Sequence, residues 1–140
     1  MESTKNQFLE GLNKALEWEY AAAVQYIQHA SVITGPEYDA IAKELVVHAN
    51  EEIAHAVMVA NLITDLGGIP TVEVEKRETA KNAQTLLEQD LAGEELAIKI
   101  YRDLIGQAEG LQEYGARRIL EDILIQEEEH KRDLVSSLGK

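Results

Sequence analysis

The sequence predicts an all-α protein, an antiparallel bundle of four helices in which a long crossover joins the second helix to the third. Three observations support this prediction. Apolar residues recur at helical spacing along almost the whole chain of 140 residues. Proline occurs only at positions 36 and 70, and strand-like alternation is confined to a short stretch around residues 71–74. The length suits one buried core, so residues 1–140 are expected to form a single domain.

The first two helices are expected to form a hairpin. Thr4 and Gln7 have the spacing of a capping box, which places the start of the first helix near residue 5 and its end before Gly35. Pro36 suits the first turn of the second helix, where its missing N–H has no helical partner. That helix is expected to run to residue 66 and to stop at glycines 67 and 68. The short joint indicates an antiparallel pair.

The last two helices repeat this arrangement. The third is expected over about residues 80–109, ending at Gly110, and the fourth over about residues 112–138, ending at Gly139. The connection between the two hairpins is longer. Residues 67–78 can span roughly 40 Å when extended, and a helix of about 28 residues is about 42 Å long. The linker can therefore cross the full length of the bundle.

Composition excludes several classes of function. The chain has no cysteine, which excludes disulfides, thiolate metal ligands and iron–sulfur clusters, so a bound metal must use nitrogen and oxygen ligands. The net charge of −13 would repel phosphate backbones, so no nucleic-acid partner is expected. No segment approaches the roughly 20 apolar residues of a membrane span, and residues 1–7 are too polar for a signal peptide. A cytoplasmic protein without membrane contact is expected.

Polar residues interrupt the apolar stripe of every helix. The first and third helices each contribute a glutamate, and the second and fourth each contribute a Glu-x-x-His motif. The six residues are Glu19, Glu52, His55, Glu94, Glu127 and His130. Each residue of the first half has its counterpart 75 positions later, and Tyr26 and Tyr101 have the same spacing. Two such hairpins, packed about an approximate two-fold axis, would bring four carboxylates and two imidazoles to one level.

Four buried carboxylates need compensating charge, because burying one without a partner costs on the order of several kcal/mol. Two divalent cations balance four negative charges. The Glu-x-x-His spacing places both side chains on one face of a helix, so each motif can serve one metal ion. Glu19 and Glu94 would then complete the two coordination shells or bridge between them. Oxygen and imidazole ligands suit Fe, Mn, Co or Zn.

Other polar residues near these motifs are given structural or solvent-facing roles. The acidic neighbours assigned to solvent are Glu51, Glu95, Glu128 and Glu129. Glu95 is the alternative to Glu94 as a ligand, since one residue of helix rotation separates them, but only Glu94 keeps the 75-residue spacing. His29 and His48 are expected to be structural. The two tyrosines of the stripes either pack in the core or hydrogen-bond to the ligands.

With these motifs in place, the chain resembles the bacterioferritin and rubrerythrin branch of the ferritin-like superfamily. The likeness covers about residues 5–138 and rests on residues 19–26, residues 50–55, Glu94 with Tyr101, and residues 120–130. In that branch, one Glu from each of two helices and a Glu-x-x-His motif from each of the other two hold a di-iron centre. The resemblance implies that all six family ligands are present here and that the metal is iron.

Departures from the family pattern narrow these expectations. Ile53 stands where bacterioferritins carry their haem-ligating Met, so no haem is expected. The sequence shows neither the fifth helix typical of ferritin cages nor the rubredoxin domain of rubrerythrins. The resemblance implies pairing of bundles through the first two helices, and Trp18, Tyr20 and Ile53 add apolar groups outside the ligand stripe. A homodimer or a larger homo-oligomer is therefore expected, with cage or dimer left open.

The expected activity is ferroxidase chemistry, the oxidation of Fe(II) by O2 or H2O2, serving iron binding, storage or detoxification. Two iron ions per chain are expected, with Mn or Zn as substitutes. A pair of Fe(II) ions can deliver two electrons to one oxidant molecule. One alternative is a rubrerythrin-like peroxidase that takes electrons from an external donor. The other is a non-catalytic iron-binding module.

Overall fold

The computed structural model describes residues 2–140, with side chains described from residue 4 onward, and these residues form four long helices. The helices are α1 (Glu2–Val32), α2 (Asp39–Asp65), α3 (Ala83–Gly110) and α4 (Tyr114–Ser137), and a short 3-10 helix, η1 (Pro36–Tyr38), precedes α2. No strand occurs within the described residues. The all-α prediction is therefore confirmed.

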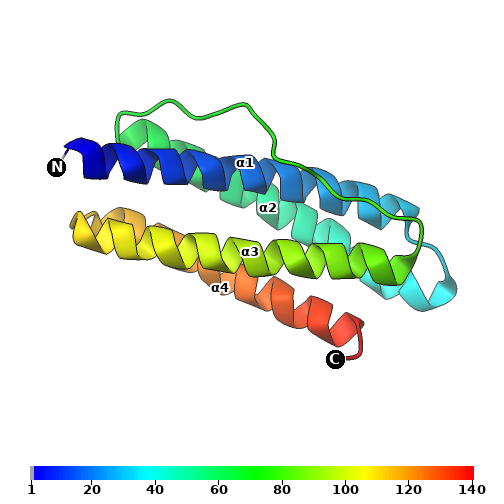
Figure 1. The fold of residues 1–140 in the computed structure, drawn as a ribbon. Coiled ribbons are helices and arrows are strands. Elements are labelled where there is room, and N and C mark those ends of the chain that lie inside the picture. Colours follow the sequence, from blue (N-terminus) through cyan, green and yellow to red (C-terminus); the bar gives the residue numbers. More distant parts are fainter. Residues whose placement is uncertain (1) are drawn as a thin grey trace.

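The helices form an antiparallel bundle (Figure 1). Helix α1 packs against α2 and α3, and α4 packs against the same two helices from the opposite corner. Neighbouring helices run in opposite directions, so the helices at diagonal corners are parallel. The two hairpins, α1–α2 and α3–α4, lie side by side with their long axes roughly aligned.

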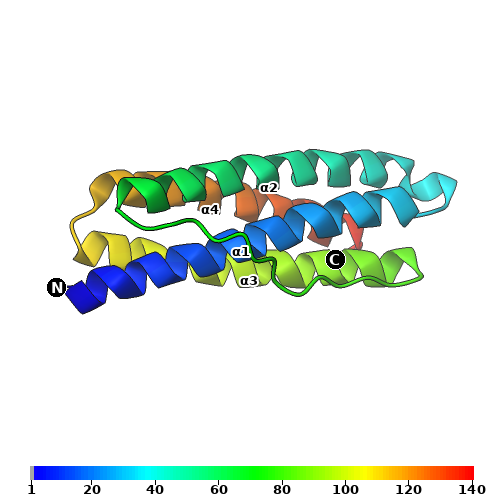
Figure 2. The same cartoon turned by 90° about the horizontal axis from the view of Figure 1, so that it is seen from above.

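The crossover between the hairpins, expected over residues 67–78, occupies residues 66–82. Figure 2 shows this segment leaving the end of α2 and passing along α1 to reach the start of α3 at the other end of the bundle. Side chains of α1 hold it in place. Asn13 donates to the carbonyl of Ile69 (3.1 Å) and accepts from the N–H of Thr71 (2.8 Å), and Gln25 accepts from the N–H of Glu78 (2.7 Å). The strand-like alternation at residues 71–74 belongs to this extended linker.

Two expected helix starts in the first hairpin are wrong. Helix α1 begins at Glu2, so Thr4 lies inside its first turn and does not cap it. No Gly or Pro between residues 2 and 10 stops the helix from extending to that point. Pro36 begins η1 instead of α2, which starts three residues later at Asp39. At the other end of α2 the expectation holds, because Gly67 has φ 90°, a conformation that few residues other than glycine adopt readily.

Helices α3 and α4 both start later in the sequence than expected. Helix α3 starts at Ala83 because Asn82 caps it, with its side-chain oxygen accepting from the N–H of Thr85 at 2.8 Å. Helix α4 starts at Tyr114. Gln112 cannot belong to it, since its φ of 59° lies in the left-handed region. Glycine 110 is the last residue of α3 and not a residue beyond it.

Two apolar clusters fill the interior, one on each side of a polar layer. The larger cluster includes Leu12, Leu104 and Leu120, and the smaller includes Leu45 and Leu134, all almost fully buried. Burial of one such side chain stabilises the fold by about 1.5–3 kcal/mol. The clusters therefore supply stability on both sides of the layer, where carboxylates replace apolar side chains. None of the helices described over residues 2–140 combines the length and apolar character needed to cross a membrane.

Candidate metal centre

The polar layer contains all six residues that the sequence analysis selected. Helices α1 and α3 each supply one glutamate, and α2 and α4 each supply a Glu-x-x-His pair. Their exposed fractions are Glu19 3%, Glu52 0%, His55 2%, Glu94 2%, Glu127 0% and His130 2%. Glu95 is exposed and lies 3.6 Å from the ammonium of Lys131. The placement thus favours Glu94 over Glu95.

The six side chains form two overlapping groups. One group is Glu19, Glu52, His55 and Glu127, and the other is Glu52, Glu94, Glu127 and His130. Within each group the candidate ligand atoms all lie within 4.8 Å of one another. Glu52 and Glu127 belong to both groups, so their carboxylates occupy the positions from which two neighbouring metal ions could be bridged. Each group has one imidazole and one carboxylate of its own.

Two buried tyrosines orient the unshared carboxylates. The hydroxyl of Tyr26 on α1 donates to Glu94 Oε1 on α3 at 2.7 Å. The hydroxyl of Tyr101 on α3 donates to Glu19 Oε2 on α1 at 2.6 Å. Each tyrosine therefore holds one oxygen of the glutamate on the opposite helix, and that oxygen lies 3.5 Å from the Nδ1 of a central histidine. The other oxygen of each glutamate makes no hydrogen bond. This assigns the tyrosines a role beyond packing.

The residues fit a metal pair, because most of their polar atoms lack any other partner. Eight buried atoms of the six side chains make no hydrogen bond. They are Glu19 Oε1, Glu52 Oε1 and Oε2, Glu94 Oε2, Glu127 Oε1 and Oε2, His55 Nδ1 and His130 Nδ1. His55 Nδ1 lies 2.9 Å from Glu52 Oε1 and 3.4 Å from Glu127 Oε1, but without the orientation of a hydrogen bond. Buried polar atoms without partners are costly, and two divalent cations would satisfy them together.

Without metal, protons take the place of the cations. Burial and the charge of Glu127 raise the pKa of Glu19 to about 7 and that of Glu94 to about 8. Burial and the charge of Glu19 raise the pKa of Glu52 well above its ordinary value. Burial also acts to raise the pKa of Glu127, but contacts with His130 and His55 outweigh it and lower the pKa to about 2. The shared carboxylates are thus unlike: the pKa of Glu127 is lowered and that of Glu52 is raised.

Both histidines are cations in the metal-free centre. Burial by itself would lower their pKa values, but contacts with Glu127 and Glu19 raise the pKa of His55 to about 10. Contacts with Glu127 and Glu94 raise the pKa of His130 to about 11 in the same way. Binding of metal ions at the Nδ1 atoms must therefore displace protons from both imidazoles.

Sequence reasoning missed a pair of residues behind the histidines. Glu51, which was assigned to solvent, accepts from His130 Nε2 at 3.1 Å. Gln126, which was not singled out, accepts from His55 Nε2 through its side-chain oxygen. The sequence did contain a signal for this pair, since residues 51 and 126 have the same 75-residue spacing as the six central residues. Glu128 and Glu129 do lie at the surface, and Glu128 pairs with Arg102 at 3.3 Å.

The remaining histidines lie outside the six-residue centre. His29 is fully buried and pairs with Asp90, with 2.8 Å between its Nδ1 and Asp90 Oδ1, and its Nε2 lies 2.7 Å from the carbonyl oxygen of Glu78 in the crossover. This arrangement ties the linker to α1 and α3, as a structural role requires. His48 stacks on His130 with 4.0 Å between ring centroids, and its Nε2 lies 3.3 Å from Asp133 Oδ2 and 3.5 Å from a carboxylate oxygen of Glu44.

A pocket between α1 and α3 reaches the carboxylates from the surface. Its wall includes Trp18, Ala22, Gly93 and Ala97, and Glu19 and Glu94 line its inner part. Small side chains at the contact of the two helices keep this path open. This pocket is one route by which a small molecule can approach the centre.

A family comparison agrees with this architecture. The ferritin-like domain family matches residues 9–140. The chain belongs to the ferritin-like family. Among relatives of similar sequence, a bacterioferritin of Brucella melitensis is 29% identical, covering 94% of this chain and 86% of the relative. A nutrient stress-induced DNA-binding protein of Nostoc sp. is also 29% identical, covering 94% of this chain and 77% of the relative.

Solved structures show the same ferritin-like fold. A ferritin-like di-iron-carboxylate protein of Bacillus anthracis superposes with a TM-score of 0.95 at 28% identity, and 99% of each chain is covered. A dodecameric thioferritin of Bacteroides fragilis, described as bacterioferritin-related, superposes with a TM-score of 0.90 at 30% identity, covering 96% of this chain and 86% of that one. The ferritin-like bundle with its long crossover is therefore shown for this chain.

Proposed function

We propose that this ferritin-like chain binds two iron ions between its six central residues and oxidises Fe(II) with O2 or H2O2. The observation that carries the proposal is the set of eight buried oxygen and nitrogen atoms of the polar layer that make no hydrogen bond. Oxygen and imidazole donors in this proportion suit Fe(II), and Mn(II) or Zn(II) can substitute. Family relatives described as di-iron proteins and bacterioferritins support iron as the metal.

Each side chain has a separate task in the proposed centre. His55 and Glu19 would hold one metal ion, and His130 and Glu94 the other. Glu52 and Glu127, which belong to both groups of ligand atoms, would bridge the two. Tyr26 and Tyr101 keep Glu94 and Glu19 aimed at the metals through hydrogen bonds of 2.7 and 2.6 Å. The second oxygen of each of these glutamates is buried and makes no hydrogen bond, so it is available to a metal ion.

The electron balance of the reaction sets what the centre must accommodate. Two Fe(II) ions would supply two electrons in total and be oxidised to Fe(III). With H2O2 as oxidant, these electrons and two protons give two molecules of water, and with O2 they give one molecule of H2O2. The oxidant is small enough for the pocket between α1 and α3, which ends at Glu19 and Glu94. The larger apolar cluster covers the layer on one side and keeps bulk water out.

The amount of Fe(II) oxidised tests the proposal. Fe(II) would be added anaerobically at about two and about twenty equivalents per chain, and oxygen uptake would be followed after mixing with air. A ferroxidase continues to oxidise the excess iron. Arrest after two irons per chain would instead support the peroxidase alternative, with electrons from an external donor. An absence of oxygen uptake, together with no Fe(III) formed when H2O2 replaces air, would support a non-catalytic iron-binding module.

Self-association is the second part of the proposal. The face formed by α1 and α2 exposes several large apolar side chains, at 43–56% of their area: Val24, Ile27, Val32, Val46, Val47, Ile53 and Val57. Patches of this kind mark contact sites. The Bacteroides fragilis relative is a dodecamer, so we propose that this chain forms a homodimer or a larger homo-oligomer through this face.

Haem and DNA are proposed not to be partners of this chain. Ile53 has no ligating atom, and its side chain is 46% exposed on the apolar face. An absorption spectrum of purified protein with a Soret band would contradict the absence of haem. Two relatives are named as DNA-binding proteins, but a net charge of −13 opposes contact with phosphates. A gel-shift assay with duplex DNA at low salt should therefore show no complex.

A further inference from the structure

A continuous hydrogen-bond chain connects the outer nitrogens of the two central histidines. His55 on α2 contacts Gln126 on α4, and His130 on α4 contacts Glu51 on α2, both through Nε2. The amide nitrogen of Gln126 donates to Glu51 Oε2 at 3.0 Å, which closes the chain between the two helices. The four side chains thus form one network behind the proposed ligands.

The donor and acceptor groups of these side chains fix the direction of every hydrogen bond in this network. The Glu51 carboxylate can only accept, so His130 Nε2 and Gln126 Nε2 must both donate to it. With its nitrogen facing Glu51, Gln126 turns its oxygen to His55, so His55 Nε2 must also donate. Both imidazoles are therefore protonated at Nε2, and both direct Nδ1 at the central carboxylates. The network selects the ligand atom in each half.

The network is symmetric in position and unsymmetric in charge. Residues 51 and 126 are equivalent under the 75-residue spacing that relates the two halves. His130 nevertheless donates to an anion, while His55 donates to a neutral amide. A carboxylate that accepts from the outer N–H of an imidazole makes its other nitrogen a better metal ligand, and loss of such a partner typically weakens binding by about 10–100-fold.

We propose that Glu51 and Gln126 make the two metal positions unequal. The position at His130 and Glu94 binds a divalent cation more tightly and fills first, and the position at His55 and Glu19 fills second and releases its ion more readily. Glu51 and Gln126 are positioning residues, since they act through the histidines and not on the metal. The inference rests on the proposed two-metal centre and adds an order of filling to it.

A reciprocal exchange tests this order. The double variant Glu51→Gln/Gln126→Glu keeps the total charge and the Glu–Gln hydrogen bond but moves the carboxylate behind His55. Native and exchanged proteins would each be loaded with one equivalent of Zn(II) per chain, which is redox-inert. Anomalous diffraction at the zinc edge then gives the occupancy of each position, and calorimetry gives the two affinities in solution.

The native and exchanged proteins should show opposite preferences for the two metal positions. Native protein should hold most of the zinc at His130, and the exchanged protein should hold most of it at His55. Glu51→Gln alone should weaken the tighter site by about tenfold and make the two sites nearly equal. Glu129→Gln removes the same charge from an exposed position of α4 and should leave both affinities unchanged.

Each contrary result has its own meaning. Equal occupancy of the two positions in native protein, or an unchanged order after the exchange, would overturn the inference while leaving the two-metal centre intact. Failure of native protein to bind two zinc ions at these residues would overturn the centre itself. The melting temperature of each metal-free variant is the control for folding, because it reports whether the exchange disturbed the bundle.

Discussion

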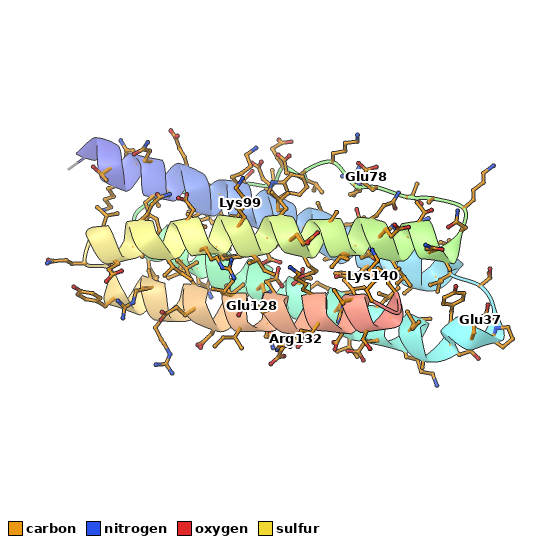
Figure 3. All side chains as sticks on the ribbon, turned by 60° about the horizontal axis from the view of Figure 1, so that its bottom comes forward. Glu37, Glu78, Lys99, Glu128, Arg132 and Lys140 are labelled. Atoms are coloured by element: carbon orange, nitrogen blue, oxygen red, sulfur yellow. The ribbon has the colours of Figure 1, made fainter. Side chains whose placement is uncertain are left out.

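The α1–α2 and α3–α4 hairpins are alike inside the bundle and unlike outside it. Their central residues match at a spacing of 75, from Glu19 and Glu94 to His55 and His130. Outside, the α1–α2 face carries most of the exposed large apolar side chains of the described residues, while the α3–α4 face is charged. Figure 3 shows Lys99 on α3 and Glu128 and Arg132 on α4 across that face. The proposed metal pair would constrain the interior of both hairpins equally, whereas the proposed contact between subunits would constrain only the α1–α2 exterior.

The two hairpins also differ inside the bundle, next to the crossover. His29 and Asp90 form a buried pair that holds the linker, but the equivalent positions carry Leu104 and Ala15, both in the larger apolar cluster. A buried ion pair adds little net stability. Its use at one end only is explained by the linker, whose carbonyl at residue 78 needs a donor there. The approximate symmetry therefore holds at the six proposed ligands and is lost next to the crossover.

The largest expected effect comes from the two shared carboxylates. Glu52→Gln and Glu127→Gln should each weaken binding of at least one metal ion and slow Fe(II) oxidation by about 100-fold or more. Metal stoichiometry and stopped-flow oxidation rates measure this, with Glu129→Gln as the control. Native rates in both variants would show that the bridging positions have been misassigned.

Without metal, the same two variants should differ in stability, although residues 52 and 127 occupy equivalent positions in the two hairpins. Glu127 is the anion that both histidines contact, so Glu127→Gln should destabilise metal-free protein by about 2 kcal/mol. Burial and the charge of Glu19 raise the pKa of Glu52 and so disfavour its ionised form, and Glu52→Gln should therefore change stability little or increase it. Chemical denaturation in the presence of a chelator compares them, and equal losses would contradict the assignment of charges.

Stability should depend on pH in opposite senses with and without metal. The pKa values of Glu19 and Glu94 are raised from 4.5 to about 7 and about 8, so the folded chain holds more protons than the unfolded chain over this range. Metal-free stability should therefore fall as pH rises from about 4.5 through about 8. With excess Zn(II) it should rise, because cations replace the protons. Melting temperatures between about pH 5.5 and pH 8 measure both slopes.

The contribution of each hairpin to the pH dependence of metal-free stability can be measured separately. Glu19→Gln and Glu94→Gln should each remove part of the metal-free pH dependence, since the two carboxyls occupy equivalent positions. Parallel slopes with and without Zn(II) would contradict the exchange of protons for metal.

The exterior difference predicts a selective effect on assembly. Ile53→Lys on α2 places a charge within the apolar face and should shift the oligomer toward the monomer. Ile125→Lys on α4 is the matched control, because Ile125 is exposed to a similar extent, 53% against 46% for Ile53. Light scattering after size-exclusion chromatography measures the mass of each variant. An unchanged mass for Ile53→Lys would place the contact on another face.

The smallest effect concerns a glycine whose equivalent is a tryptophan. Gly93 on α3 corresponds to Trp18 on α1, and both line the pocket between the helices. A Cβ added at Gly93 would meet no atom within 4 Å. Gly93→Ala should therefore stabilise the fold by about 0.8–1 kcal/mol through helix propensity, without a change in the oxidation rate. Thermal denaturation measures the gain, and a loss of stability would show that the pocket needs an open position there.

Much of this protein could be predicted from the sequence because its pattern is repeated. The helical period, the glycines at the helix ends and the 75-residue spacing were enough to select the four-helix bundle, the crossover and the six central residues. Spacing also chose Glu94 over Glu95, since one residue of rotation moves a side chain from the core to the surface. Helix starts were less accurate, as at Gln112, because a single positive φ angle leaves little trace in an apolar pattern.

Only the tertiary structure decided which residues support the ligands. The sequence by itself determined that four glutamates and two histidines share one layer, because periodicity places a residue on a face. It did not show that Glu51 reaches His130, that Tyr26 reaches Glu94, or that His29 holds the crossover. Those contacts join residues of different helices or of a linker. Their distances depend on how the helices are rotated and staggered against one another, which no single helix encodes.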